Sequence, residues 1–214
     1  METEMKAKKK VKNSMKVDLG QNLSFTISDA WRQLKSMPED PPGSKVFAME
    51  TENCQGFFMA FPTKGEQTMP FDNPQAVIDG IHDALTDNQA LIEVKSDSIG
   101  KSRIIYSIVK SRKESSGVQY TLTMDIGTDH GAVRLQGFFD EVGATGVRDA
   151  VVYEMKRRNG AVDINFEGWM ADPYDNDFQK PYLMNLSEHK EFDSMFPQHP
   201  LSIARAFAAK IIAV

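Results

Sequence analysis

Three aspartates in one short segment are the first group of side chains that could do chemistry. Asp172, Asp175 and Asp177 lie in the segment ADPYDNDFQKP, and hard cations prefer carboxylate oxygens as ligands. A calcium-binding loop that starts at Asp175 needs glycine at its sixth position and glutamate at its twelfth. The chain has Lys180 and Leu186 there. The simplest interpretation is therefore a loop of solvated carboxylates.

His189 and Asp193 are spaced four residues apart, as two ligands on one face of a helix would be. Two ligands do not complete a metal site, so an intrahelical hydrogen bond is the simpler interpretation. If His189 joined the three aspartates, the chain could be a metal-assisted hydrolase. That activity is the alternative hypothesis, and we expect neither a bound metal nor a cofactor.

Other catalytic patterns are incomplete in this sequence. Cys54 lies in the polar link TENCQG with no histidine within 25 positions, so we expect an exposed or half-buried thiol. The sequence contains no G-x-S-x-G elbow, phosphate-binding loop or dinucleotide fingerprint. The turn at 143–146 could offer N–H groups to an anion, but it lacks a lysine and fits a helix cap better. We expect no catalytic residue.

Aromatic side chains suggest binding instead. Trp169 and Tyr174 bracket the acidic loop, and Phe138 should point away from the buried Phe139. Exposed Trp and Tyr are common in protein interfaces. The alternative is that these rings anchor the C-terminal segment to the sheet. The predicted binding residues are Phe138, Trp169, Asp172, Tyr174, Asp175 and Asp177.

Charge is uneven along the 214 residues. The first 16 residues contain six lysines and two glutamates, whereas the whole chain has a net charge of −5. An acidic body argues against a broad nucleic-acid surface, so residues 1–17 are predicted to be a basic, solvated arm. No apolar run is long enough to span a membrane, and a lone cysteine fits a reducing compartment. These features predict a cytoplasmic protein.

Hydrophobic periodicity predicts the elements of the first 140 residues. Apolar runs indicate a strand at 23–27, a hairpin at 46–61 and strands at 90–94 and 103–110, the last covered on both faces. Long alternation from 118 to 140 indicates a second hairpin. Asn73 and Pro74 mark the start of a helix that ends near 86.

The remaining residues predict mainly helices. A helix at 145–158 has Val147, Val151 and Met155 on one face, and it is expected to pack against the sheet together with the helix at 73–86. An extended run at 161–169 precedes helices at 187–195 and 200–212, the last with Phe207 and Ile211 on its apolar face. We therefore predict an α/β protein of the α+β type. It has a twisted antiparallel sheet sandwiched by helices, in a domain at 18–160, and a C-terminal helical extension at 161–214.

The order of these elements resembles the PsbP-like fold. The likeness covers about residues 23–158, and its markers are Trp31, Gly100, Tyr120 and Gly146. The resemblance implies an α/β sandwich without shared catalytic residues, in a family of assembly factors, secretion adaptors and regulators. It favours a non-catalytic adaptor that binds another, unidentified protein. Neither nucleic-acid binding nor membrane insertion is expected.

Overall fold

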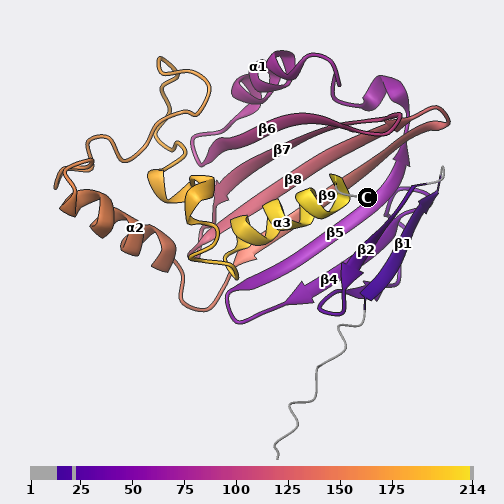
Figure 1. The fold of residues 1–214 in the computed structure, drawn as a ribbon, viewed down its shortest axis with the longest axis horizontal. Helices are drawn as coiled ribbons and strands as arrows, with labels where there is room; N and C mark the ends of the chain where they lie inside the picture. The colour runs from indigo at the N-terminus through magenta and orange to yellow at the C-terminus, as the bar shows by residue number, and fades with distance from the viewer. Residues whose placement is uncertain (1–13, 21–22, 213–214) are drawn as a thin grey trace, which may run out of the picture.

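The fold is built on a seven-stranded antiparallel sheet. The structure is a computed structural model that describes residues 14–20 and 23–212. Its strand order is β3-β4-β5-β9-β8-β7-β6 (Figure 1). The strands are β3 (Arg32–Leu34), β4 (Lys45–Glu50), β5 (Cys54–Thr63), β6 (Gln89–Ile99), β7 (Ser102–Arg112), β8 (Val118–Thr128) and β9 (Gly131–Glu141). A second, two-stranded sheet contains β1 (Ser14–Gly20) and β2 (Leu23–Ser28).

Period-two alternation sets which strand residues face the core. In β8, Tyr120, Leu122 and Met124 are buried, and β9 pairs with β8 in the register that places Tyr120 opposite Phe139. Both predicted hairpins and the antiparallel α+β class are therefore confirmed. Strand β7 is buried on both faces, as predicted, although it is the second strand from one edge.

Helix α3 (Pro200–Ile212) crosses one face of the sheet (Figure 1). Its apolar side inserts into the main hydrophobic cluster, next to Phe25, Phe58 and Phe139. The docking of Phe207 and Ile211 is as the sequence predicted. Residues 161–214 therefore contribute, through α3, to the central hydrophobic core.

Helix α1 (Pro74–Ala84) lies on the opposite face, over β6. The Asn73 side chain accepts a hydrogen bond from the Ala76 N–H at 3.1 Å, and Pro74 fills the first helical position. Ile78 and Leu91 pack in a cluster that also contains Val109, which alternates with the Ile108 that faces α3. Helices thus lie on both faces of the sheet, as the sequence predicted, and α1 packs mainly on the edge strand β6.

Helix α2 (Val147–Arg158) corrects one expectation. It lies beyond the end of the sheet (Figure 1) and packs against the C-terminal segment rather than against the strands. Its buried Val152 contacts a cluster that contains Val162, Trp169 and Phe192. The predicted stripe does exist along the helix, but it faces solvent. The reason is that the chain from 161 onward folds back over the other side of α2.

Two further expectations for the C-terminal segment are wrong. Residues 161–169 form a series of turns, in which the Asp163 carboxylate accepts N–H bonds from Asn165 and Glu167. The predicted helix at 187–195 is replaced by two short 3-10 helices, η2 (Leu186–Glu188) and η3 (Lys190–Phe192). His189 between them has an extended backbone, which interrupts the helix. A third 3-10 helix, η1 (Gly65–Gln67), follows β5.

The segment predicted as a basic arm, residues 1–17, overlaps the first strand. Strand β1 starts at Ser14, and Val17 and Leu19 are buried in the main core. The alternation of Val17 and Leu19 with polar residues is too short to indicate a strand by itself, and it directly follows a lysine-rich segment. The lysines before Ser14 lie outside the described residues. In the parts of the chain that the structure describes, no helix is long and apolar enough to cross a membrane.

Candidate functional site

The acidic loop is fastened to the body of the protein through Asp172. Asp172 is buried, and its Oδ2 lies 3.0 Å from Nε2 of His82 on α1. Its Oδ1 accepts hydrogen bonds from the N–H groups of Tyr174 and Asp175 at 2.9 and 3.0 Å. The carboxylate is therefore occupied by the protein's own donors. Asp175 and Asp177 remain exposed, joined by a bond from the Asp177 N–H to Asp175 Oδ1.

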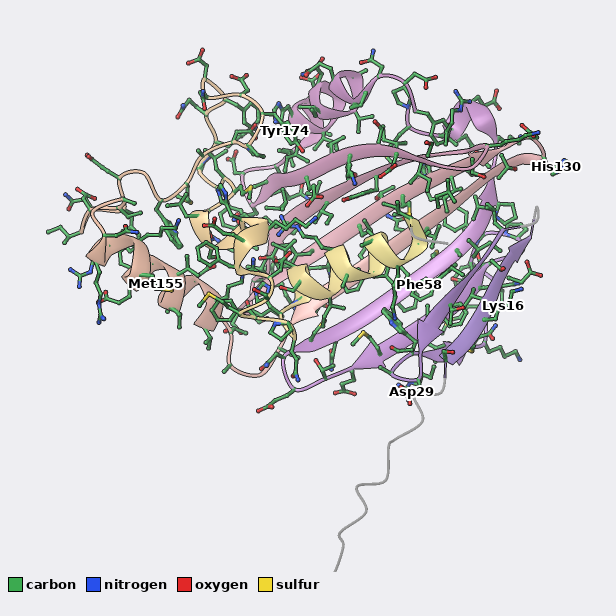
Figure 2. The ribbon with its side chains drawn as sticks, in the orientation of Figure 1. Lys16, Asp29, Phe58, His130, Met155 and Tyr174 are labelled. Atoms are coloured by element: carbon green, nitrogen blue, oxygen red, sulfur yellow. The ribbon has the colours of Figure 1, made fainter. Side chains whose placement is uncertain are left out.

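Tyr174 closes part of a sheet edge. Its hydroxyl accepts a hydrogen bond from the Val94 N–H at 2.6 Å and donates one to the Val94 carbonyl at 3.2 Å. Val94 belongs to β6, the last strand of the sheet, where backbone groups would otherwise face solvent. Figure 2 shows Tyr174 where the loop approaches this edge. The Phe178 ring stacks on His82 at 4.0 Å and adds a second attachment.

The other predicted binding residues lie elsewhere. Trp169 is buried in the cluster under α2, so it is not a surface aromatic. Phe138 is half-buried on the sheet face opposite α3, with its ring 6.3 Å from that of Phe57. The structure thus distributes the six predicted residues among a docked loop, an internal cluster and an open sheet face. Anchoring of the C-terminal segment, the alternative that the sequence left open, describes Trp169 and Tyr174.

The residues of the hydrolase hypothesis do not come together either. Among residues 14–20 and 23–212, no three His, Cys, Asp or Glu side chains are placed to hold one metal ion. His189 lies between η2 and η3, and the Asp193 carboxylate accepts hydrogen bonds from Arg148 and Arg205. Cys54 is fully buried, which corrects its predicted exposure, and burial raises the pKa of its thiol to about 12. A thiol held protonated in this way is a poor nucleophile.

A buried ionic network joins the sheet to the C-terminal segment. Glu188 accepts hydrogen bonds from Lys110 Nζ at 2.7 Å and from the Tyr120 hydroxyl at 2.8 Å. Glu188 and Lys110 are almost completely buried. Burial and the nearby Glu188 charge raise the pKa of Tyr120 well above its usual value. The sequence did not predict this network, because its members are 68 to 78 residues apart.

Arg148 of α2 is the second centre of this network. Its guanidinium donates to the Ser187 carbonyl, to Ser202 Oγ and to Asp193 Oδ1, at 2.8 to 2.9 Å. Shifted pKa values can mark active sites, but structural ion networks cause them too. Every buried side-chain nitrogen or oxygen in the described part of the chain has a hydrogen-bond partner. We therefore interpret the network as structural, because it leaves no buried polar atom for a substrate.

The exposed side of α2 carries apolar side chains. Val147, Val151 and Met155 are 47%, 41% and 43% exposed and follow each other at four-residue spacing. Met195, 49% exposed, borders a hollow of about 410 Å³ that Val147 also lines. Figure 2 labels Met155 on α2. We call these four residues the α2 face.

Charged side chains lie at both ends of α2, next to this face. At the N-terminus, Glu141 Oε1 accepts a hydrogen bond from the Gly146 N–H at 2.7 Å, so the protein's own carboxylate occupies the place of an anion. The last turn carries Lys156, Arg157 and Arg158. Both arginines are exposed and pair with Glu154.

The sequence contained the stripe of the α2 face but assigned it to the core. The signal that could have corrected this was the charge of the remaining helix, VRDAVVYEMKRR, whose other positions hold few apolar residues. Because the other positions of the helix hold few apolar residues, either side of α2 could face the interior. The stripe faces solvent because Arg148 on the opposite side has buried hydrogen-bond partners.

Comparisons with known proteins find likeness in structure only. No family model matches the sequence, and no curated protein matches it. Protein PA94 of Pseudomonas aeruginosa, of unknown function, is 13% identical over 68% of this chain and 92% of its own, with a TM-score of 0.36. Cyanobacterial PsbP of Synechocystis is 13% identical over 70% and 90%, at 0.40. The Ran-binding protein Mog1p of Saccharomyces cerevisiae is 9% identical over 67% and 84%, at 0.40. PsbP, whose fold the sequence resembles, is among these structures.

Proposed function

We propose that this protein is a non-catalytic adaptor that binds another protein through the α2 face. One observation carries the proposal: α2 buries Arg148 and turns Val147, Val151 and Met155 to the surface. A helix that only completes a fold does the reverse, with its apolar stripe inward. Contiguous exposed apolar residues are typical of interaction sites in soluble proteins.

The α2 face is also held rigid. Arg148 is held by hydrogen bonds to the C-terminal segment and α3, and Val152 packs on Trp169. A partner therefore meets a helix whose backbone is already ordered, which lowers the entropy cost of binding. Full burial of one Val or Met side chain contributes about 1.5–3 kcal/mol.

The partner that fits best is an amphipathic helix with acidic residues at one end. Three residues spaced by four along α2 present a ridge that a second helix can pack against. The exposed Arg157 and Arg158 lie next to Met155, on a chain with a net charge of −5. Acidic residues of the partner would be attracted to this basic turn and would fix its direction. We further propose that the adaptor acts in the cytoplasm, which suits a single, fully buried cysteine.

The test replaces Met155 with glutamate and compares the proteins co-purified from native lysate. Met155→Glu and Val151→Glu should lose the partners that the wild type retains, and direct binding of the purified partner should weaken by about tenfold or more. The matched control is Met37→Glu, because Met37 is another exposed methionine, in a loop away from α2.

Variants of the acidic loop test the alternative binding site. If Asp175→Ala and Asp177→Ala lose a partner that Met155→Glu retains, recognition lies in the loop, and the α2 proposal is wrong. Equal recovery by all the variants would exclude both surfaces.

A further inference from the structure

A groove separates α3 from the corner where β2 leads toward β3. Its volume is about 540 Å³, within the range of about 300–1,000 Å³ that is usual for small-molecule sites. Ile203, Ala206 and Phe207 of α3 line one side, and Trp31 and Met49 line the other. None of the four residues of the α2 face lines it, although Pro197 and Gln198 line both this groove and the hollow beside Met195.

The apolar floor of the groove is preformed. The Trp31 ring packs 5.4 Å from Phe207 and 4.9 Å from Phe58, in an aromatic cluster that continues into the core. Gly56 makes room for this arrangement. A Cβ there would lie 2.7 Å from Met49 Cγ and 3.2 Å from the Trp31 ring. The ring contacts with Phe58 and Phe207 hold the Trp31 side chain in place before any ligand arrives.

The groove is lined by one charged side chain. Lys210 is the charged residue that lines the groove, and no carboxylate lines it, although the chain as a whole is acidic. Lys210 is exposed, and no residue that the structure describes forms a hydrogen bond or an ion pair with its side-chain ammonium group. An unpaired ammonium group beside an apolar groove is complementary to an anion with an apolar body.

We propose that this groove binds a free long-chain carboxylate, that is, a fatty acid. The alkyl chain lies along Trp31 and Phe207, and the carboxylate pairs with Lys210. A peptide would bring an N–H and a C=O group at each residue, and each needs a partner when it is buried. The groove offers few polar side chains for that purpose, among them Ser28, Thr51 and Gln198. An alkyl chain makes no such demand.

Tryptophan fluorescence gives a direct readout. The chain has two tryptophans, and Trp169 lies in the separate cluster under α2, so Trp169→Phe leaves Trp31 as the sole reporter. Laurate, added below its micelle concentration, should change the Trp31 emission saturably with one site per chain. Calorimetry on the wild type should give the same affinity. Butyrate, with a short chain, should not bind, and dodecanol should bind more weakly than laurate.

Variants separate the charge from the apolar contact. Lys210→Gln should weaken laurate about two- to fivefold, the range for one exposed ion pair, and should leave dodecanol unchanged. Ala206→Glu should weaken laurate about tenfold or more, because it places a carboxylate in the groove. Ala209→Glu is the matched control, since Ala209 is exposed on the same helix but does not line the groove. Ala206→Met, which only fills space, replaces Ala206→Glu if circular dichroism shows that the latter is unfolded.

Four results would overturn the proposal. The first is laurate that causes no saturable change in either assay. The second is equal binding of laurate by wild type and by the folded Ala206 variant. Equal affinity for laurate and dodecanol would remove the role of Lys210. Tighter binding of an apolar peptide with a free C-terminal carboxylate would assign the groove to a protein segment.

Discussion

His199 shows at the scale of one residue how burial fixes a protonation state. Desolvation, with the positive charges of Arg148 and Arg205, lowers the pKa of His199 from 6.5 to about 3. The ring is therefore neutral near pH 7. Its Nδ1 accepts a hydrogen bond from the Leu201 N–H at 3.3 Å, at the start of α3. Its Nε2 lies 3.8 Å from Glu141 Oε1.

A neutral histidine in the native state makes stability depend on pH. Because its pKa is lower folded than unfolded, His199 contributes full stability above about pH 6.5, and that contribution falls as the pH drops toward 3. We expect its contribution to the free energy of unfolding to fall by about 2 kcal/mol between pH 7 and pH 5. Urea unfolding of wild type and His199→Gln at both pH values isolates this effect. An equal change in the two proteins would contradict it.

At the scale of the elements, the acidic loop covers part of the edge strand β6. A free strand edge can pair with another chain and promote aggregation. Tyr174 satisfies both backbone groups of Val94, while the Lys180 ammonium group donates to the Leu85 carbonyl at 3.2 Å, at the end of α1. The acidic loop thus protects one point of the edge and ties it to α1.

Removing the Tyr174 hydroxyl should loosen this edge locally. Tyr174→Phe loses two hydrogen bonds, which together contribute about 1 kcal/mol net. We expect the Val94 amide to exchange with solvent about fivefold faster, while the exchange of amides in β8 and β9 is unchanged. The control is Tyr153→Phe, whose lost bond to the Asp163 carbonyl lies under α2. Unchanged exchange at Val94 would show that the loop does not protect the strand.

At the scale of the whole molecule, the C-terminal segment and the sheet share one hydrophobic core. Leu201, Ala204 and Ala208 of α3 are completely buried in the main core. Glu188 neutralises Lys110, which has no exposed surface. A buried charge whose partner is removed is strongly destabilising, by about 3–5 kcal/mol. Residues on both sides of the domain boundary predicted near residue 160 contribute to this core.

A chain that ends at Gly160 should not fold. It would expose the apolar face that α3 covers and would leave Lys110 without its carboxylate. We expect no cooperative thermal transition by circular dichroism and strong binding of a hydrophobic dye. A cooperative transition near that of the full chain would show that residues 161–214 are an accessory to an independent domain.

The sequence alone determined the elements whose signals are local. The β8–β9 hairpin followed from alternation, because successive side chains of a strand point to opposite faces. The start of α1 followed from Asn73 and Pro74, which act within the first helical turn. The periodicity of Val147, Val151 and Met155 gave the stripe on α2 correctly. These features depend only on neighbours along the chain.

Tertiary structure decided which side of α2 is buried. Arg148 lies inside because Ser187, Asp193 and Ser202 supply its acceptors, and they are 39 to 54 residues away in the sequence. The burial of Trp169 and the pairing of Asp172 with His82, 90 residues apart, have the same origin. Periodicity defines the faces of an element, whereas the contacts that the rest of the chain makes with it decide which face is left to solvent. The α2 face is exposed, and is therefore a candidate binding surface, because these tertiary contacts bury the opposite side of the helix.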